Sequence, residues 1–228
     1  MIGIIGAMEV EVAALRAQLK NTKTETVSGI EFACGELEGH SVVIARCGIG
    51  KVFAAMCAQT MILRYSPDCV INTGVAGTLC TDLSIGDIAV ASTVVQYDMD
   101  TSPLGDPVGL LSGINIIHLP ADQALIDTAK GVLDEQGVHY CVGTIATGDR
   151  FMSDPICKAE LHNDFGAIAC EMEGGAIGHV CYVNRVPFLV LRAISDGADE
   201  QSNMDYPTFV KMAAKRSSNV LQQLVCRL

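Results

Sequence analysis

Basic residues are scarce in this 228-residue sequence. Lys and Arg number 15 against 26 Asp and Glu, and the formal net charge at pH 7 is −11. A surface of that sign repels phosphate backbones and anionic lipids, so nucleic-acid and membrane-surface roles are disfavoured. The longest segment without a charged residue, 107–121, holds two prolines, an asparagine and a histidine, and is not a membrane span. Two glutamates and no basic residue precede Arg16, so we expect no secretory signal.

Motifs that hold zinc, dinucleotides or ATP are also missing. The ten cysteines form no Cys-x-x-Cys pair, so we expect reduced thiols in a cytoplasmic protein rather than a zinc ribbon or redox motif. Gly48-Ile49-Gly50 begins the dinucleotide-binding glycine pattern, but Phe53 occupies the third glycine position. The phosphate loop of nucleotide hydrolases fails because Val52 follows Lys51. No metal ion or organic cofactor is expected.

Half of the residues are hydrophobic, and short apolar runs alternate with helical patterns. That alternation predicts one α/β domain over residues 1–228, with helices on both faces of a mixed, largely parallel sheet. Strands are predicted at 2–5, 41–45, 69–72, 88–95, 142–147, 167–170 and 188–194. Helices are predicted from about residue 8 and at 51–64, 121–136, 174–183 and 206–224. Residues 73–77 are predicted as a turn and 99–113 as a surface loop.

Charged residues follow the predicted strands. Ligands of open α/β sheets bind beyond the carboxyl ends of the strands, and several carboxylates near one arginine suit proton transfer and hydroxyl binding. These strand ends carry Glu9, Glu11, the segment 73–77, the segment 149–152, Glu171, Glu173, Arg192 and Asp196. Position alone leaves structural roles open, because acids at a helix start complement the helix dipole and an Asp can cap a turn.

Two features of these strand ends predict close contacts. Asp196 follows a strongly apolar strand, and a charge in that position requires a partner. Arg192, inside the same strand, could form a buried ion pair with one of the acids. Gly174 and Gly175 begin a helix, where glycine lowers stability, so we expect a ligand or another backbone to approach closely there.

Six segments, in this order, carry a resemblance to a known family: GIIGAMEVE (3–11), GIGK (48–51), NTGVAG (72–77), GDRFM (148–152), EME (171–173) and RAISD (192–196). The chain resembles the bacterial 5′-methylthioadenosine/S-adenosylhomocysteine nucleosidases, of the purine nucleoside phosphorylase superfamily, over essentially its whole length. The resemblance implies a three-layer α/β/α, nucleoside phosphorylase-like fold. It also implies hydrolysis of the N-glycosidic bond of 5′-thio-substituted adenosines to adenine and a thioribose.

The resemblance assigns roles to the charged residues. Cleavage passes through an oxocarbenium-like ribosyl cation, and adenine leaves poorly unless its ring is protonated. Asp196 would deliver that proton to purine N7, and Glu11 would hold and activate the attacking water. Arg192 would belong to the network around the water and the ribose, and Glu173 would accept hydrogen bonds from both ribose hydroxyls.

The resemblance also assigns the remaining contacts with the nucleoside. Phe151 would stack on adenine, the backbone of Met152 would hydrogen-bond its edge, and Met172 would lie at the sugar. The other residues expected to contact substrate are Val75, Ala76, Gly77 and Ser195, and, in an apolar pocket for the 5′ group, Met8, Tyr206 and Phe209. In the family a second subunit completes that pocket, so the resemblance implies a homodimer.

Three positions depart from the family pattern. Val75 stands where relatives often carry a hydroxyl residue near the catalytic Asp, so backbone amides or Ser195 must position Asp196. Arg150 stands where relatives often have a small residue, with its charge at the pocket lip or in solvent. Tyr206 replaces a common phenylalanine and adds a polar group to the 5′ pocket.

Three alternative functions stay open. A phosphate-dependent purine nucleoside phosphorylase would need cationic or amide donors for phosphate, whereas Glu11 would repel that anion, which favours hydrolysis. An aminodeoxyfutalosine nucleosidase would use a related pocket. A nucleoside-binding module without catalysis is the third alternative, although binding alone would not require both an acid and a water-activating base.

Overall fold

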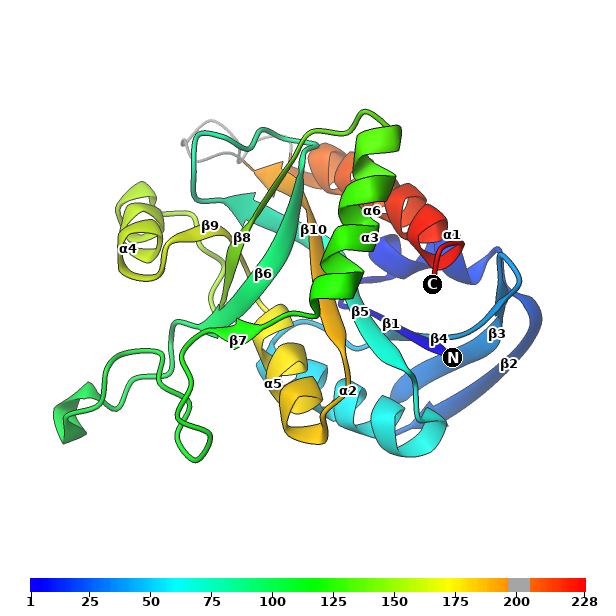
Figure 1. Cartoon of the computed structure of the whole chain (residues 1–228), viewed down its shortest axis with the longest axis horizontal. Helices are drawn as coiled ribbons and strands as arrows, with labels where there is room; N and C mark the ends of the chain where they lie inside the picture. Colours follow the sequence, from blue (N-terminus) through cyan, green and yellow to red (C-terminus); the bar gives the residue numbers. More distant parts are fainter. Residues whose placement is uncertain (197–205) are drawn as a thin grey trace.

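A computed structural model describes residues 1–196 and 206–228, and a ten-stranded mixed sheet forms its centre (Figure 1). The strands are β1 (Ile2–Gly6), β2 (Lys20–Val27), β3 (Ile30–Leu37), β4 (His40–Arg46), β5 (Cys69–Thr78), β6 (Ile88–Gln96), β7 (Leu119–Pro120), β8 (Tyr140–Thr147), β9 (Ala167–Glu171) and β10 (Phe188–Asp196). Their order is β10-β6-β8-β9-β5-β1-β4-β3-β2, with β7 beside β6. Because β10 also pairs with β5, the strands β5, β10, β6, β8 and β9 form a closed circuit.

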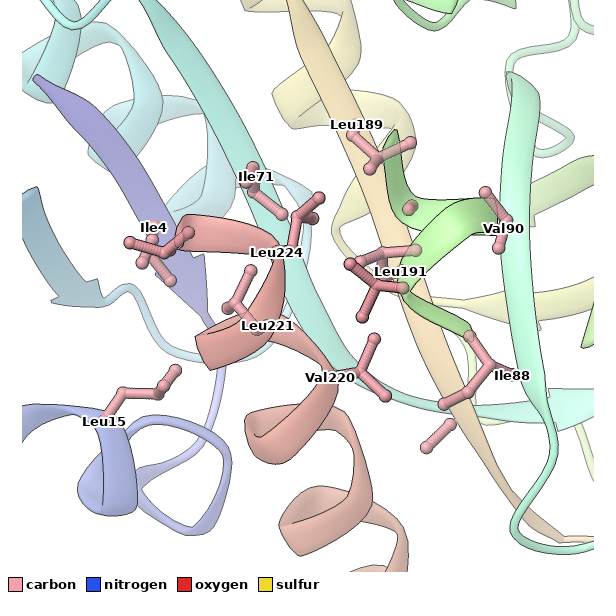
Figure 2. Packing of buried hydrophobic residues seen from close by; sticks show 14 of the residues in the cluster. Ile4, Leu15, Ile71, Ile88, Val90, Leu189, Leu191, Val220, Leu221 and Leu224 are labelled. Atoms are coloured by element: carbon pink, nitrogen blue, oxygen red, sulfur yellow. The ribbon is translucent and has the colours of Figure 1, made fainter. Parts of the chain in front are cut away.

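Helices cover both faces of the sheet. They are α1 (Glu9–Arg16), α2 (Lys51–Tyr65), α3 (Gln123–Glu135), α4 (Pro155–Phe165), α5 (Gly174–Asn184) and α6 (Tyr206–Val225), with a short 3-10 helix at Ser102–Leu104. Apolar side chains of α1, α3 and α6 pack in one core cluster, and those of α2 and α5 pack in a second. Figure 2 shows Leu221 and Leu224 of α6 beside Ile4 and Ile71 of the sheet. The predicted three-layer fold is confirmed.

None of the helices in residues 1–196 and 206–228 is long and apolar enough to cross a membrane.

Every predicted strand and helix is present, and β2, β3, β7, α4 and the 3-10 helix were missed. β2 is polar and largely exposed, and α4 buries only Lys158 and Leu161, so neither leaves a periodic apolar signal in the sequence. β3 buries Ile30, Phe32, Ala33 and Leu37 and pairs with β2 as a hairpin. The β2–β4 meander also raises the antiparallel share of the mixed sheet, because both of its pairings are antiparallel.

The predicted turn at 73–77 is wrong, because β5 continues through these residues to Thr78. In the register of β5 against β10, Gly74 lies beside Arg192 and Gly77 lies beside Asp196. A Cβ on Gly77 would lie 2.6 Å from Oδ2 of Asp196. The glycines of this segment therefore make room for the charged side chains of the neighbouring strand and do not reverse the chain.

Candidate active site

A cavity of about 110 Å³ lies at the carboxyl ends of β1, β5, β9 and β10. The predicted residues in its wall are Met8, Glu11, Val75, Ala76, Gly77, Phe151, Met152, Met172, Glu173, Arg192, Ser195 and Asp196. Five residues that carried no predicted substrate contact also line it, namely Ala7, Ile49, Arg150, Cys170 and Glu171.

Two residues predicted for the 5′ pocket are not found in the described cavity wall. Phe209 lies on α6 and is not among the described residues that form the cavity wall. Tyr206 is the first residue of α6, but its side chain lies outside the described residues.

The Glu11 carboxylate is buried and held by backbone amides. Its Oε2 accepts hydrogen bonds from the amides of Ala7 and Met8, both at 2.8 Å, and its Oε1 accepts one from the amide of Val75 at 3.1 Å. Burial raises the pKa of Glu11, while the Arg192 charge and these amides act to lower it. The three amides fix the orientation of this carboxylate.

The Arg192 guanidinium is 1% exposed and lies among acidic side chains. Its Nη2 donates to Oδ1 of Asn72 at 2.6 Å and to Oε2 of Glu173 at 3.3 Å, and it also pairs with Glu171. Burial by itself would lower the pKa of Arg192, but Glu171, Glu173 and Glu11 raise it above its ordinary value. The predicted buried ion pair is therefore present, and it involves several acids.

Glu173 lies at the cavity wall and joins two loops. Its Oε1 accepts a hydrogen bond from the amide of Gly50 at 2.9 Å, directly before α2. Burial raises the pKa of Glu173 to about 7, since the lowering effect of Arg192 is opposed by the neighbouring charge of Glu171. A carboxyl group of this kind can accept or donate hydrogen bonds near neutral pH.

Glu171 was noted at a strand end, but its contacts could not be predicted. Its Oε2 accepts hydrogen bonds from the amides of Glu173 and Gly174 at 2.8 and 2.7 Å, and its Oε1 pairs with the hydroxyl of Thr147. Glu171 thus holds the start of α5 and the Arg192 guanidinium at the same time. The only indication of Glu171 in the sequence was its position after an apolar strand and before two glycines.

The close approach predicted at Gly174 and Gly175 is present, and side chains make it. A Cβ on Gly175 would lie 2.8 Å from the Cβ and Oγ1 of Thr147, and one on Gly174 would lie 3.0 Å from a methyl of Val190. The protein atoms closest to these glycines belong to side chains of neighbouring strands and not to another backbone. Close packing of α5 on the sheet therefore requires them.

The Asp196 carboxylate has a partner for each oxygen. Oδ1 accepts a hydrogen bond from Oγ of Ser195 at 3.1 Å, which agrees with the expectation that Ser195 positions it. Oδ2 accepts a hydrogen bond from Nζ of Lys158 on α4, also at 3.1 Å. The charge partner that the sequence required is therefore Lys158, which sequence reasoning missed because α4 itself was not predicted.

The segment between β8 and α4 forms the outer side of the cavity. Phe151 is 51% exposed and Met152 is buried, and both line the cavity. Arg150 is exposed and also lines it, so its charge lies at the cavity lip. Oδ1 of Asp149 accepts a hydrogen bond from the amide of Lys51 at 2.8 Å, which ties this segment to the start of α2.

No cluster of three or more His, Cys, Asp or Glu side chains in the described part of the chain is placed to hold a metal ion.

Comparisons of this chain with a family model, with curated proteins and with solved structures agree with one another. The family model described as the phosphorylase superfamily matches residues 1–225. A 5′-methylthioadenosine/S-adenosylhomocysteine nucleosidase from Shewanella loihica is 42% identical, with 100% of this chain and 99% of that protein covered. The crystal structure of the Neisseria meningitidis nucleosidase with methylthio-immucillin-A has a TM-score of 0.95 at 34% identity, covering 100% and 99% of the two chains. Native futalosine hydrolase of Helicobacter pylori has a TM-score of 0.94 at 36% identity, covering 100% and 97%.

Proposed function

The chain belongs to the 5′-methylthioadenosine/S-adenosylhomocysteine nucleosidase family of the phosphorylase superfamily, and from that premise we propose that it hydrolyses the N-glycosidic bond of these two nucleosides. The products are adenine and the 5-thio-substituted ribose, with 5′-deoxyadenosine as a further substrate. The reaction serves methionine salvage and recycling in the methyl cycle. The joint placement of Glu11 and Asp196 in one cavity is the observation that carries this proposal.

Asp196 acts as the general acid and Glu11 as the group that activates water. The proton of Asp196 passes to N7 of the purine, and the electrons of the C1′–N9 bond move to the departing adenine. Water adds to the resulting ribosyl cation at C1′, and Glu11 takes its proton. The three amides around Glu11 support this role because they fix the direction of its carboxylate.

The remaining wall residues bind the nucleoside. Glu173 accepts hydrogen bonds from the ribose hydroxyls. Arg192 donates a hydrogen bond to Glu173, and its positive charge balances the carboxylates near the water. Phe151 stacks on adenine, and the backbone of Met152 hydrogen-bonds its edge. Met172 packs at the sugar.

Water, and not phosphate, is the nucleophile. The amides of Ala7, Met8 and Val75 could hold an anion, but the Glu11 carboxylate already occupies them. The buried guanidinium of Arg192 is neutralised by surrounding carboxylates. A phosphate at this point would meet acids, which opposes phosphorolysis.

Hydrolysis of a futalosine-type nucleoside is the second candidate function. The similarity to the Helicobacter pylori futalosine hydrolase favours it, because that enzyme matches this chain about as well as the Neisseria nucleosidase does.

The active protein is a homodimer in which the partner completes the 5′ pocket. Apolar side chains are exposed along α2 and the adjoining part of α5: Val52 (70%), Phe53 (51%), Leu63 (72%) and Val183 (57%). Ile49, which is 55% exposed, also lines the cavity directly before α2. An apolar face that reaches the mouth of a site suits a second copy of this chain.

The compartment is the cytoplasm. All ten cysteines lie within the described residues and are free thiols. Free thiols persist in a reducing compartment, which supports this placement.

Adenine release from 5′-methylthioadenosine, with and without added phosphate, tests the proposal. Equal release under both conditions supports hydrolysis. Release that requires phosphate and yields a ribose 1-phosphate would establish phosphorolysis. No release from 5′-methylthioadenosine, but release from aminodeoxyfutalosine, would favour the second candidate. Asp196→Asn should abolish hydrolysis of 5′-methylthioadenosine, because the general acid is lost, while adenosine analogues still bind.

A further inference from the structure

A lysine side chain is buried behind the proposed general acid. Lys158 of α4 has a side chain that is only 5% exposed, and its Nζ lies 3.1 Å from Oδ2 of Asp196. Lysine is almost never buried to this extent unless it is paired. Removal of two charges from water is unfavourable, and a buried ion pair often adds nothing to stability. A pair of this kind beside a reactive cavity therefore calls for a functional reason.

The geometry separates Lys158 from the substrate. Asp196 lines the cavity, whereas Lys158 is not among the described residues that form the cavity wall. Oδ1 of Asp196 accepts a hydrogen bond from Ser195, which lies on the same strand. Oδ2 accepts one from Lys158, which lies on the helix α4. The ammonium group consequently acts on the reaction through Asp196 and not through direct contact with a bound nucleoside.

The same lysine also fixes the segment that would hold adenine. Phe151 and Met152 precede α4, and Oδ1 of Asp154 caps that helix by accepting a hydrogen bond from the amide of Ile156 at 2.8 Å. Figure 1 shows α4 at the edge of the molecule beside β9. The contact of Lys158 with Asp196 ties this peripheral helix to the strand that carries the acid.

A neighbouring titratable group adds no charge to the pair. Cys170 of β9 lines the cavity, and burial raises the pKa of its thiol to about 12. It therefore stays neutral at physiological pH, and the Lys158 charge acts on Asp196 without opposition from this thiol.

We propose that Lys158 is a positioning residue for general-acid catalysis, which fixes the Asp196 carboxyl toward the base and stabilises the carboxylate left after proton donation. This inference rests on the proposed nucleoside hydrolysis. The proton passes from Asp196 to the purine, the glycosidic electrons pass to the leaving base, and Lys158 keeps its own protons. A positive charge beside the developing carboxylate favours the product of that transfer.

The test compares two leaving groups. Adenine needs a proton to leave, whereas 4-nitrophenolate does not, so a 4-nitrophenyl 5-methylthioriboside bypasses the general acid. For Lys158→Met we expect kcat on 5′-methylthioadenosine to fall at least about ten-fold, with KM changed less than about three-fold. Turnover of the nitrophenyl substrate should stay within about three-fold of wild type. Lys158→Arg, which keeps the charge and a donor, should recover most of the lost kcat.

A double-mutant cycle gives an independent readout. In the Asp196→Asn background, Lys158→Met should cost less than about two-fold, because the group through which Lys158 acts is already neutral. Lys130→Met is the matched control, since Lys130 forms an exposed ion pair with Asp127 on α3 and should leave kcat unchanged. If Lys158→Met does not fold, Lys158→Gln takes its place under the same criteria.

Three results would overturn the inference: equal losses on both substrates, an unchanged kcat on 5′-methylthioadenosine, or additive effects in the cycle. If the wild type releases no adenine from any 5′-substituted adenosine, the proposed function fails first, and the two failures are thereby distinguished.

Discussion

Replacement of Glu11 by glutamine removes one negative charge and keeps the side chain nearly the same size. Oε2 of Glu11 accepts hydrogen bonds from the amides of Ala7 and Met8 at 2.8 Å, and Oε1 accepts one from the amide of Val75 at 3.1 Å. Glutamine has only one accepting oxygen, so its NH₂ group would face the Val75 amide. One buried donor would then lose its partner, and Arg192 would lose part of its compensating charge.

The expected magnitudes follow from that geometry. A buried donor without a partner costs about 1–3 kcal/mol, and a chain of this size loses about 2–4 °C in Tm for each kcal/mol. We therefore expect Glu11→Gln to fold with a Tm lower by about 2–12 °C. Loss of the water-activating base should lower kcat by about 10²–10⁴-fold.

Three measurements on purified protein separate these effects: adenine release from 5′-methylthioadenosine, adenine affinity by calorimetry, and thermal unfolding. Adenine affinity should be nearly unchanged, because Glu11 is assigned to the water and not to the base. Glu9→Gln is the matched control, since Glu9 is exposed, lies outside the cavity wall and pairs with Arg16. Retention of more than about a tenth of wild-type kcat in Glu11→Gln would refute the assigned role.

Three further predictions concern other contacts of the molecule. Gly74→Ala should lose most activity and stability, because the new Cβ would overlap the buried Arg192 guanidinium and lie 2.7 Å from Oε1 of Glu11. Adenine release beside a melting curve checks this, and full activity contradicts it. The pKa of Glu173 is raised from 4.5 to about 7, so the folded state keeps this proton to higher pH than the unfolded chain. The ligand-free protein should therefore lose up to about 3 kcal/mol of stability as pH rises from about 4.5 to 7. Urea unfolding across that range should show a flatter dependence in Glu173→Gln, and an unchanged slope would count against the raised pKa. Val52→Glu should shift the protein to monomers in sedimentation velocity and lower its activity, whereas a monomeric wild type would remove the proposed homodimer.

Local sequence patterns predicted most of the elements. Apolar runs such as that of β10 and the amphipathic pattern of α3 are visible in a few consecutive residues, because side-chain periodicity follows directly from backbone geometry. Polar segments such as β2 and α4 lack that pattern. Their conformation depends on contacts with segments that are distant in the sequence.

The sequence also indicated some properties of the candidate-site residues and not others. Chemical type and position at strand ends marked a wider set that also held Glu9 and Glu171. The family resemblance then assigned roles to Glu11, Glu173, Arg192 and Asp196. The structure brings these residues to one cavity, while their assigned roles remain predictions. Phe209, which the resemblance assigned to the 5′ pocket, lies on α6 and is not among the described residues of the cavity wall, so its role stays a prediction.

The sequence by itself determined which side chains could do chemistry and most of the segments that form the sheet and helices. Tertiary structure alone decided the partners: Lys158 meets Asp196 across 38 positions, and Gly50 meets Glu173 across 123. It also decided that the glycines of β5 make room for charged side chains and do not form a turn. The physical reason is that burial and ion pairing depend on distances in space, which only the packing of strands and helices fixes.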